Sequence, residues 1–238
     1  MLVSHGHGFV FLKVRKAAGT SIEMALEPLC RPAGATVSER TPAIVTAQGV
    51  VGRRLSPRPR NRDARCLDWR NHMPAAEIRA ALGDARWSRY MKVTSVRDPF
   101  DLAVSRYHWE LARRALPEAA DFAETRRQFA AMVSDPTYDG GHELVHVEGA
   151  FVADRVIRFE RLGTDFAAIS AELAPDRPPL PRTKTTTDRR RRPVADYYDD
   201  ASVAAIRRAA AWVFDLFDYP DRPTPGRPRP LPSLEVTP

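Results

Sequence analysis

The sequence is poor in cysteine and has no long hydrophobic run. Its 238 residues include only two cysteines, Cys30 and Cys66, which cannot form a disulfide framework and do not have the spacing of metal ligands. No stretch of 18 apolar residues is present, so we expect no membrane-spanning segment and no stable membrane insertion. Residues 1–8 lack the charged and then apolar pattern of a secretory signal. These absences favour a protein of the reducing cytoplasm.

The excess of basic residues is the first positive feature. The net charge is +7 and the isoelectric point is near 9.8, which suits an anionic ligand or partner such as phosphate, sulfate, an acidic glycan or nucleic acid. Alternatively, much of the arginine simply solvates the surface. No nucleic-acid recognition motif with interleaved aromatic residues is present, so we expect no nucleic-acid partner. We expect one domain over residues 1–220 and a disordered, Pro-rich tail over 221–238.

Residues 8–22 predict a phosphate-binding loop. A short apolar strand over Phe9–Val14 is followed by a small, basic and hydroxylic stretch, Arg15–Ser21, and then by a helix. Backbone N–H groups at a helix N-terminus attract anions, and Lys16, with the hydroxyls of Thr20 and Ser21, would add to this attraction. The usual nucleotide loop places its lysine after the last glycine. Here Lys16 precedes Gly19 by three positions, so that pattern does not apply.

A second strand and helix carry a further anion motif. The strand over Tyr90–Val96 runs directly into Arg97, and Pro99 opens a helix that Asp98 is placed to cap. The planar guanidinium of arginine can donate hydrogen bonds to two phosphate oxygens at once. Ser105 follows two helical turns later and can reach back toward the same ligand. In open α/β sheets, ligands bind outside the carboxyl ends of the strands, where Arg97 stands.

Other segments give coarser expectations. Residues 30–72 contain several prolines and an arginine-rich stretch over 53–65, and we expect them to be irregular. A third core strand is expected over Val152–Phe159. A last helix is expected to follow Asp196–Asp199 and to continue through Phe217.

Together these motifs resemble sulfotransferases that use 3′-phosphoadenosine 5′-phosphosulfate (PAPS). The loop is similar to the carbohydrate-type branch, related to heparan sulfate 2-O- and chondroitin sulfotransferases. The resemblance implies an α/β fold with a central parallel sheet flanked by helices, of the P-loop-like sulfotransferase type. It implies transfer of a sulfuryl group from PAPS to a hydroxyl or amine, with no metal. It assigns binding of PAPS, or of its product PAP, to Arg15, Lys16, Ala18, Gly19, Thr20, Ser21, Arg97, Ser105, Lys184 and Arg189.

The resemblance also suggests catalytic roles. Lys16 would stabilise charge on the oxygen that leaves the sulfuryl group, and His72 would take the proton of the acceptor. His108 and Glu23 are the alternatives for this base. Lys13 stands where many relatives have histidine, and it could add charge at the phosphates.

The small residues of the loop raise a conformational question. Ala17 and Ala18 replace residues that include a glycine in relatives, so the loop is expected to keep negative φ angles at both positions.

Three other readings remain open from the residues alone. A nucleotide-binding P-loop kinase-like protein would need the Gly-x4-Gly-Lys order and an acidic residue at a strand end for Mg²⁺, and neither is present. The case for a nucleic-acid-binding protein depends on basic charge alone. A catalytically inactive relative that binds PAPS or PAP would have the same motifs. The expected acceptor is a glycan or glycosylated metabolite.

Overall fold

The computed structural model describes residues 1–34, 36–39, 41–52, 69–114, 119, 121–174, 180–181 and 192–224. These residues form two compact units, and the chain passes between them more than once. The first unit takes its residues from 1–96 and 143–181, and the second from 97–142 and 192–224. The division into a domain of residues 1–220 and a tail of 221–238 stays a prediction, because most of that tail lies outside the described residues.

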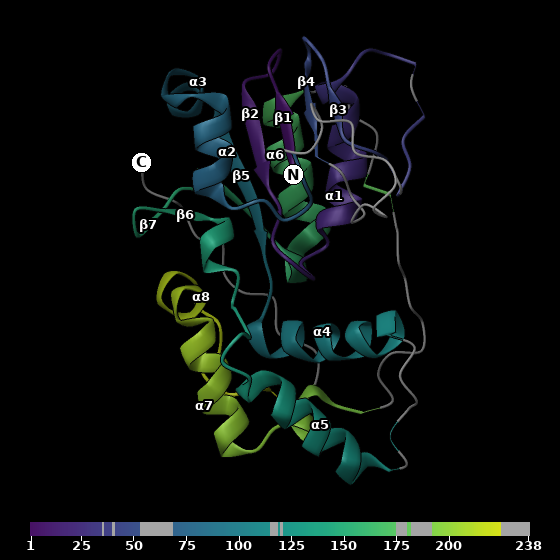
Figure 1. The fold of residues 1–238 in the computed structure, drawn as a ribbon, viewed down its shortest axis with the longest axis vertical. Helices are drawn as coiled ribbons and strands as arrows, with labels where there is room; N and C mark the ends of the chain where they lie inside the picture. The colour runs from purple at the N-terminus through teal and green to yellow at the C-terminus, as the bar shows by residue number, and fades with distance from the viewer. Residues whose placement is uncertain are drawn as a thin grey trace. The chain divides into compact units, whose positions relative to one another are not determined.

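The first unit contains a six-stranded sheet in the order β3-β4-β1-β2-β5-β8 (Figure 1). Its strands are β1 (Leu2–Ser4), β2 (Phe9–Leu12), β3 (Ile44–Val45), β4 (Gly49–Val51), β5 (Met91–Val96) and β8 (Arg155–Arg158). Strand β5 runs parallel to β2 and to β8, whereas the pairs β1–β2, β1–β4 and β3–β4 are antiparallel. The sheet is therefore mixed, and the prediction of a parallel sheet is correct only for β2, β5 and β8.

Short connections explain the antiparallel half of the sheet. Only residues 5–8 join β1 to β2, whereas a parallel pair would need a crossover of about a dozen residues or more. Strand β1 was not predicted from the sequence, and β3 and β4 lie in a segment that was expected to be irregular. These strands have only two or three residues each, which is too short for a hydrophobic period to be recognised.

Helices complete both units. The first contains α1 (Gly19–Leu26), α2 (Ala75–Leu82), α3 (Asp84–Arg89), α6 (Leu162–Leu173) and a small hairpin of β6 (His146–Val147) and β7 (Ala150–Phe151). The second contains α4 (Pro99–Arg114), α5 (Phe122–Ser134), α7 (Asp200–Ala209) and α8 (Ala211–Leu216). None of these helices is long and apolar enough to cross a lipid bilayer.

The second unit is held by an aromatic cluster. Phe129 packs edge-on against Tyr198, with ring centroids 4.9 Å apart, and Tyr198 also packs edge-on against Phe100. The Tyr198 hydroxyl donates a hydrogen bond of 2.8 Å to the carbonyl oxygen of Phe100. The single last helix expected from the sequence is two helices, because the backbone leaves the helical conformation at Ala210 (φ −115°).

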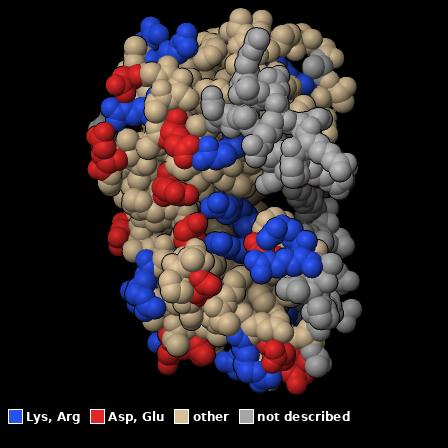
Figure 2. Space-filling view, viewed as in Figure 1, with Lys and Arg blue, Asp and Glu red and all other residues tan. Residues whose placement is uncertain are grey.

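Acidic side chains lie among the basic ones on the face of the molecule drawn in Figure 2. Several exposed arginines of the first unit form ion pairs: Arg70 with Glu77 (2.6 Å), Arg79 with Asp84 (2.7 Å) and Arg155 with Glu172 (2.9 Å). Such surface pairs contribute about 0–1 kcal/mol each to stability. Part of the arginine content is therefore balanced locally, and the net charge alone does not mark a ligand site.

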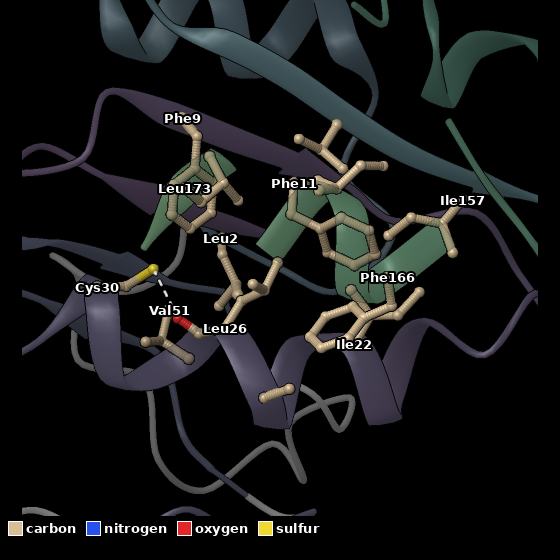
Figure 3. Close-up of a cluster of buried hydrophobic side chains, with 13 residues drawn as sticks. Leu2, Phe9, Phe11, Ile22, Leu26, Cys30, Val51, Ile157, Phe166 and Leu173 are labelled. Carbon is tan, nitrogen blue, oxygen red and sulfur yellow. Dashed lines mark hydrogen bonds between the residues drawn. The ribbon is translucent and has the colours of Figure 1, made fainter. Parts of the chain in front are cut away.

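The core of the first unit lies between the sheet and two helices. Phe11 projects from β2 toward Ile22 of α1 and Phe166 of α6, and Phe9 lies beside Leu173 of α6 (Figure 3). All four residues of β2 are buried, as expected of a strand that is covered on both faces. This burial fixes β2 and α1, and with them the two ends of the connecting loop.

Replacement of Phe11 by alanine should therefore destabilise the first unit strongly. The ring is fully buried, and such a truncation costs about 3–5 kcal/mol because it removes apolar contacts and leaves a cavity. The measurement is urea unfolding followed by tryptophan fluorescence. Val45→Thr, a β-branched exchange at a position 48% exposed, is the control and should change the free energy of unfolding by less than about 0.5 kcal/mol. Equal losses in both variants would contradict this account of the core.

Candidate functional site

The carboxyl ends of the parallel strands lie along one edge of the sheet. Leu12, the last residue of β2, pairs in register with Thr94 of β5, and Val96 of β5 pairs with Arg158 of β8. The chain leaves β2 through residues 13–18 to reach α1, and it leaves β5 directly into Arg97. Both anion motifs predicted from the sequence therefore begin immediately after strands whose carboxyl ends share this edge.

The loop before α1 contains two non-glycine residues in the left-handed region. Lys16 has φ 61° and Ala18 has φ 58°. The expectation of a negative φ at Ala18 is therefore wrong, although Ala17 is not among the residues with positive φ. A left-handed residue costs about 1–2 kcal/mol for an amino acid with a Cβ atom. Packing of the flanking β2 and α1 into the core overrides this local preference.

The N-terminus of α1 has the character of an anion site. Ala18 is its N-cap residue, and the alanine side chain makes no capping hydrogen bond. The first intrahelical bond of this turn runs from the N–H of Ile22 to the carbonyl of Ala18, at 3.2 Å. The preceding N–H groups, those of Gly19, Thr20 and Ser21, belong to the first turn, in which an α-helix offers no acceptor of its own. With the positive end of the helix dipole, they favour an anion.

Lys13 and Glu23 form a buried ion pair behind this loop. Lys13 Nζ lies 2.5 Å from Glu23 Oε2, and the N-terminal ammonium of Met1 contacts Glu23 Oε1. Burial alone would raise the pKa of Glu23, but the ammonium of Met1 and the charge of Lys13 together lower it to about 2. Glu23 is thus a poor proton acceptor, which argues against it as the alternative base. Lys13 directs its charge toward this carboxylate.

His72 lies against the same loop. Its Nδ1 is 3.0 Å from the carbonyl oxygen of Lys13, and since a carbonyl can only accept, Nδ1 carries the proton and donates it. Nε2 is then the ring nitrogen with a lone pair. Burial, together with the charges of Lys13 and Arg15, lowers the pKa of His72 to about 3, and the hydrogen bond to Lys13 opposes this only in part. His72 is therefore neutral near pH 7 with its lone pair on Nε2, and at this pKa it is a weak base as long as no ligand changes its surroundings.

Left-handed backbone conformations concentrate at this place. Among the described residues, four non-glycine positions have positive φ: Lys16, Ala18, His72 and Glu148. Glu148 and Gly149 form the two-residue turn between β6 and β7, and such hairpin turns require positive φ at both positions. The other three belong to the loop and to the histidine that contacts it. Costly conformations of this kind cluster at functional sites.

Arg97 and Ser105 lie on the second unit, at the start of α4 and two turns along it. Asp98 Oδ1 accepts the N–H groups of Phe100 (2.8 Å) and Asp101 (3.2 Å), which confirms the predicted cap. Both Arg97 and Ser105 are buried. Arg97 is held through Nε and Nη2 by Asp101 Oδ2, at 2.7 and 2.5 Å. Asp101 thus fixes the orientation of the guanidinium and balances part of its charge.

The remaining predicted site residues have different surroundings. Nε2 of His108 lies 2.9 Å from the hydroxyl of Tyr197, within the aromatic cluster of the second unit. His108 therefore has a structural partner there. Lys184 and Arg189 lie outside the described residues, as does the arginine-rich stretch over 53–65.

Two ion pairs were not predicted from the sequence, although a feature of the sequence indicates each of them. Asp101 stands four residues after Arg97 on a helix, which is the spacing of an ion pair. Glu23 is an acidic residue on the otherwise apolar inner face of α1, and a buried carboxylate requires a cation. The cations are the ammonium of Met1 and Lys13, the residue that departs from the pattern of the resembled family.

Ala18→Gly should stabilise the protein, because glycine adopts φ 58° without steric cost. We expect a gain of about 0.5–1 kcal/mol in the free energy of unfolding, measured by urea titration. Ala17→Gly is the matched control. Ala17 is fully buried and lacks a positive φ, so the same exchange should cost about 0.5–1 kcal/mol. A loss of stability in Ala18→Gly would show that the left-handed conformation is not strained.

The low pKa of His72 predicts a specific dependence of stability on pH. The folded protein keeps His72 neutral to about pH 3, whereas the unfolded chain protonates it near 6.5. Stability from this residue is therefore complete above pH 6.5 and is lost as the pH falls toward 3. The free energy of unfolding is measured by urea titration at several pH values between 6.5 and 4.5. Its slope against pH should correspond to up to one more proton taken up on unfolding in the wild type than in His72→Asn. Equal slopes would mean that His72 titrates normally in the folded state.

Comparison with known proteins adds no relative to this description. No protein-family model matches the sequence, no curated protein matches it, and no solved structure matches it. The case for a function therefore depends on the loop, on His72 and on the Arg97–Ser105 motif of this chain.

Proposed function

We propose that the protein is a PAPS-dependent sulfotransferase. The observation that carries the proposal is the loop of residues 13–18, which leads from the carboxyl end of a parallel strand into the N-terminus of α1, with a neutral histidine against it. The fold supports the same proposal at a coarser level, because it is a mixed α/β sheet flanked by helices. The resemblance of the loop and of the Arg97–Ser105 segment selects PAPS among phosphate-containing ligands.

The groups that would bind the 5′-phosphosulfate of PAPS differ in chemical type from those that would bind its 3′-phosphate. The 5′-phosphosulfate would meet the N-terminal turn of α1, where Gly19, Thr20 and Ser21 offer N–H groups and two of them offer hydroxyls. The 3′-phosphate would meet Arg97 and Ser105. Asp101 already orients the Arg97 guanidinium, so less side-chain freedom is lost on binding.

The chemistry follows from charge and proton placement. PAPS supplies the sulfuryl group. Lys16 would stabilise the negative charge that develops on the phosphate side as the bond to sulfur breaks. His72 would accept the acceptor's proton at Nε2, while Nδ1–H stays bonded to the Lys13 carbonyl. The anionic donor would raise the pKa of His72 from its low value by opposing the charges of Lys13 and Arg15.

The acceptor that we propose is a glycan or glycosylated metabolite with a free hydroxyl or amine. The carbohydrate-type loop favours this class over other acceptors. A catalytically inactive relative would bind PAP equally well but would transfer nothing. A kinase-like protein would favour ATP with Mg²⁺. Binding and transfer therefore have to be measured separately.

The binding experiment is titration of PAP and of Mg²⁺-ATP by calorimetry. We expect tight binding of PAP, much weaker binding of ATP, and a loss of about tenfold or more in PAP affinity in Arg97→Ala, because a charge-assisted pair to phosphate contributes about 1.5–3 kcal/mol. Arg106→Ala is the matched control. Arg106 lies on the same helix and stacks on Tyr138 at 4.5 Å, so its removal changes net charge equally and should alter PAP affinity less than about twofold. Equal affinities for PAP and ATP would contradict the proposal.

The transfer experiment uses ³⁵S-labelled PAPS and an extract of candidate acceptors. Wild-type protein should transfer label, and Lys16→Ala should reduce the rate by about a hundredfold or more, since the lysine acts on the developing charge. Tight PAP binding with no transfer, and no difference between wild type and Lys16→Ala, would identify a PAP-binding protein without catalysis.

A further inference from the structure

Lys13 connects three parts of the loop site. Its ammonium pairs with Glu23, its carbonyl oxygen accepts the Nδ1–H of His72, and its aliphatic stem passes over Gly19. Neither the side chain of Lys13 nor that of Glu23 is more than 4% exposed. A lysine held at both its side chain and its carbonyl oxygen has few conformations left. The anchored ammonium therefore adds a second restraint on the Lys13 backbone, beside the buried strand β2 that precedes it.

Gly19 is adapted to this path of the Lys13 side chain. A Cβ atom on Gly19 would lie 2.7 Å from Lys13 Cγ and 2.9 Å from Cε, closer than real contacts allow. Gly19 is not among the residues with positive φ, so a left-handed backbone does not explain the glycine. The loop therefore uses glycine here to let Lys13 reach the helix.

Glu23 is the fixed end of this connection. It is fully buried on α1, one helical turn after Gly19, and remains ionised because its pKa is about 2. An ionised carboxylate in such a place holds its cations firmly, because breaking the pair leaves an uncompensated buried charge at a cost of about 3–5 kcal/mol. The anchoring of Lys13 is therefore stronger than that of an exposed lysine pair.

We propose that Glu23 is a positioning residue that acts through Lys13 on His72. By anchoring the Lys13 ammonium, Glu23 fixes the Lys13 carbonyl, and this carbonyl holds the proton of His72 on Nδ1. Nε2 is thereby kept as the accepting nitrogen in the free protein. The consequence for catalysis rests on the proposed sulfuryl transfer, whereas the effect on the imidazole does not.

The direct test is the tautomer of His72 in the free protein, read from ¹⁵N chemical shifts of histidine-labelled protein and assigned with His72→Asn. In the wild type the proton should lie on Nδ1. In Glu23→Gln, which keeps the shape of the side chain but removes its charge, we expect a substantial population of the Nε2–H form. An unchanged tautomer in a folded Glu23→Gln protein would overturn the proposal.

Glu27→Gln is the matched control. Glu27 is also fully buried, follows Glu23 by one turn, and pairs instead with Arg31 at 3.0 Å. It should leave His72 with its proton on Nδ1 even if stability falls. Equal changes in the two variants would show a general structural effect and would also overturn the proposal. Should Glu23→Gln fail to fold, Lys13→Met makes the same test, because it leaves Glu23 paired with the Met1 ammonium.

The kinetic test follows once transfer is measured. Glu23→Gln should lower kcat by about tenfold or more, as misplacement of a catalytic group does, while the KM for PAPS changes less than about threefold. A rise in KM with kcat unchanged would overturn the positioning role. If the wild type binds no PAP, the sulfotransferase proposal fails, but the tautomer experiment still decides whether Glu23 controls His72.

Discussion

The carboxylate of Glu23 imposes a constraint that reaches most of the loop site. A buried, ionised carboxylate is stable only with cations in contact, and here they are Lys13 and the ammonium of Met1. Satisfying it brings the end of β2 against the second turn of α1 and requires glycine at position 19. The shape of the loop thus depends in part on this buried ion pair.

The sheet contributes the second constraint. Because β2, β5 and β8 are parallel neighbours, the segments that follow them leave from one edge. The antiparallel strands β1, β3 and β4 extend the sheet beyond β2 and give β2 a hydrogen-bonded neighbour on each side. Combined with burial of all four β2 residues, this makes the strand before the loop a rigid support, on which a precisely held binding loop depends.

The sequence predicted the parts of the fold that have a strong period or a strong local signal. The strands β2 and β5, the start of α4 at Pro99 and the cap by Asp98 followed from apolar runs and from helix-start chemistry. Strands of two or three residues could not be recognised, because so few residues define no period. The interruption at Ala210 could not be predicted either, because alanine is the best helix former and gives no local signal for the end of a helix.

The residues of the candidate site could be predicted from the sequence, but the contacts between their side chains could not. Lys16, Gly19 and Arg97 could be predicted as site residues because each lies in a recognisable sequence motif. That Lys13 turns toward Glu23 could not be derived, since a lysine at a strand end can equally point to solvent or to a ligand. The left-handed φ of Ala18 contradicts local preference, so no rule based on propensity would have given it.

This conflict between preference and conformation bears on function. A chain under selection for stability alone would be expected to place glycine or asparagine at positions 16, 18 and 72, since these residues tolerate left-handed conformations best. Instead the positions hold lysine, alanine and histidine. Lysine and histidine provide chemistry that glycine cannot, and His72 directs its Nδ1 to the Lys13 carbonyl. Alanine at position 18 has no such chemistry, but its methyl group packs against the core beneath the loop and restricts the motion of the turn. Strain at positions 16 and 72 is the cost of side-chain function, and strain at position 18 is the cost of a rigid turn.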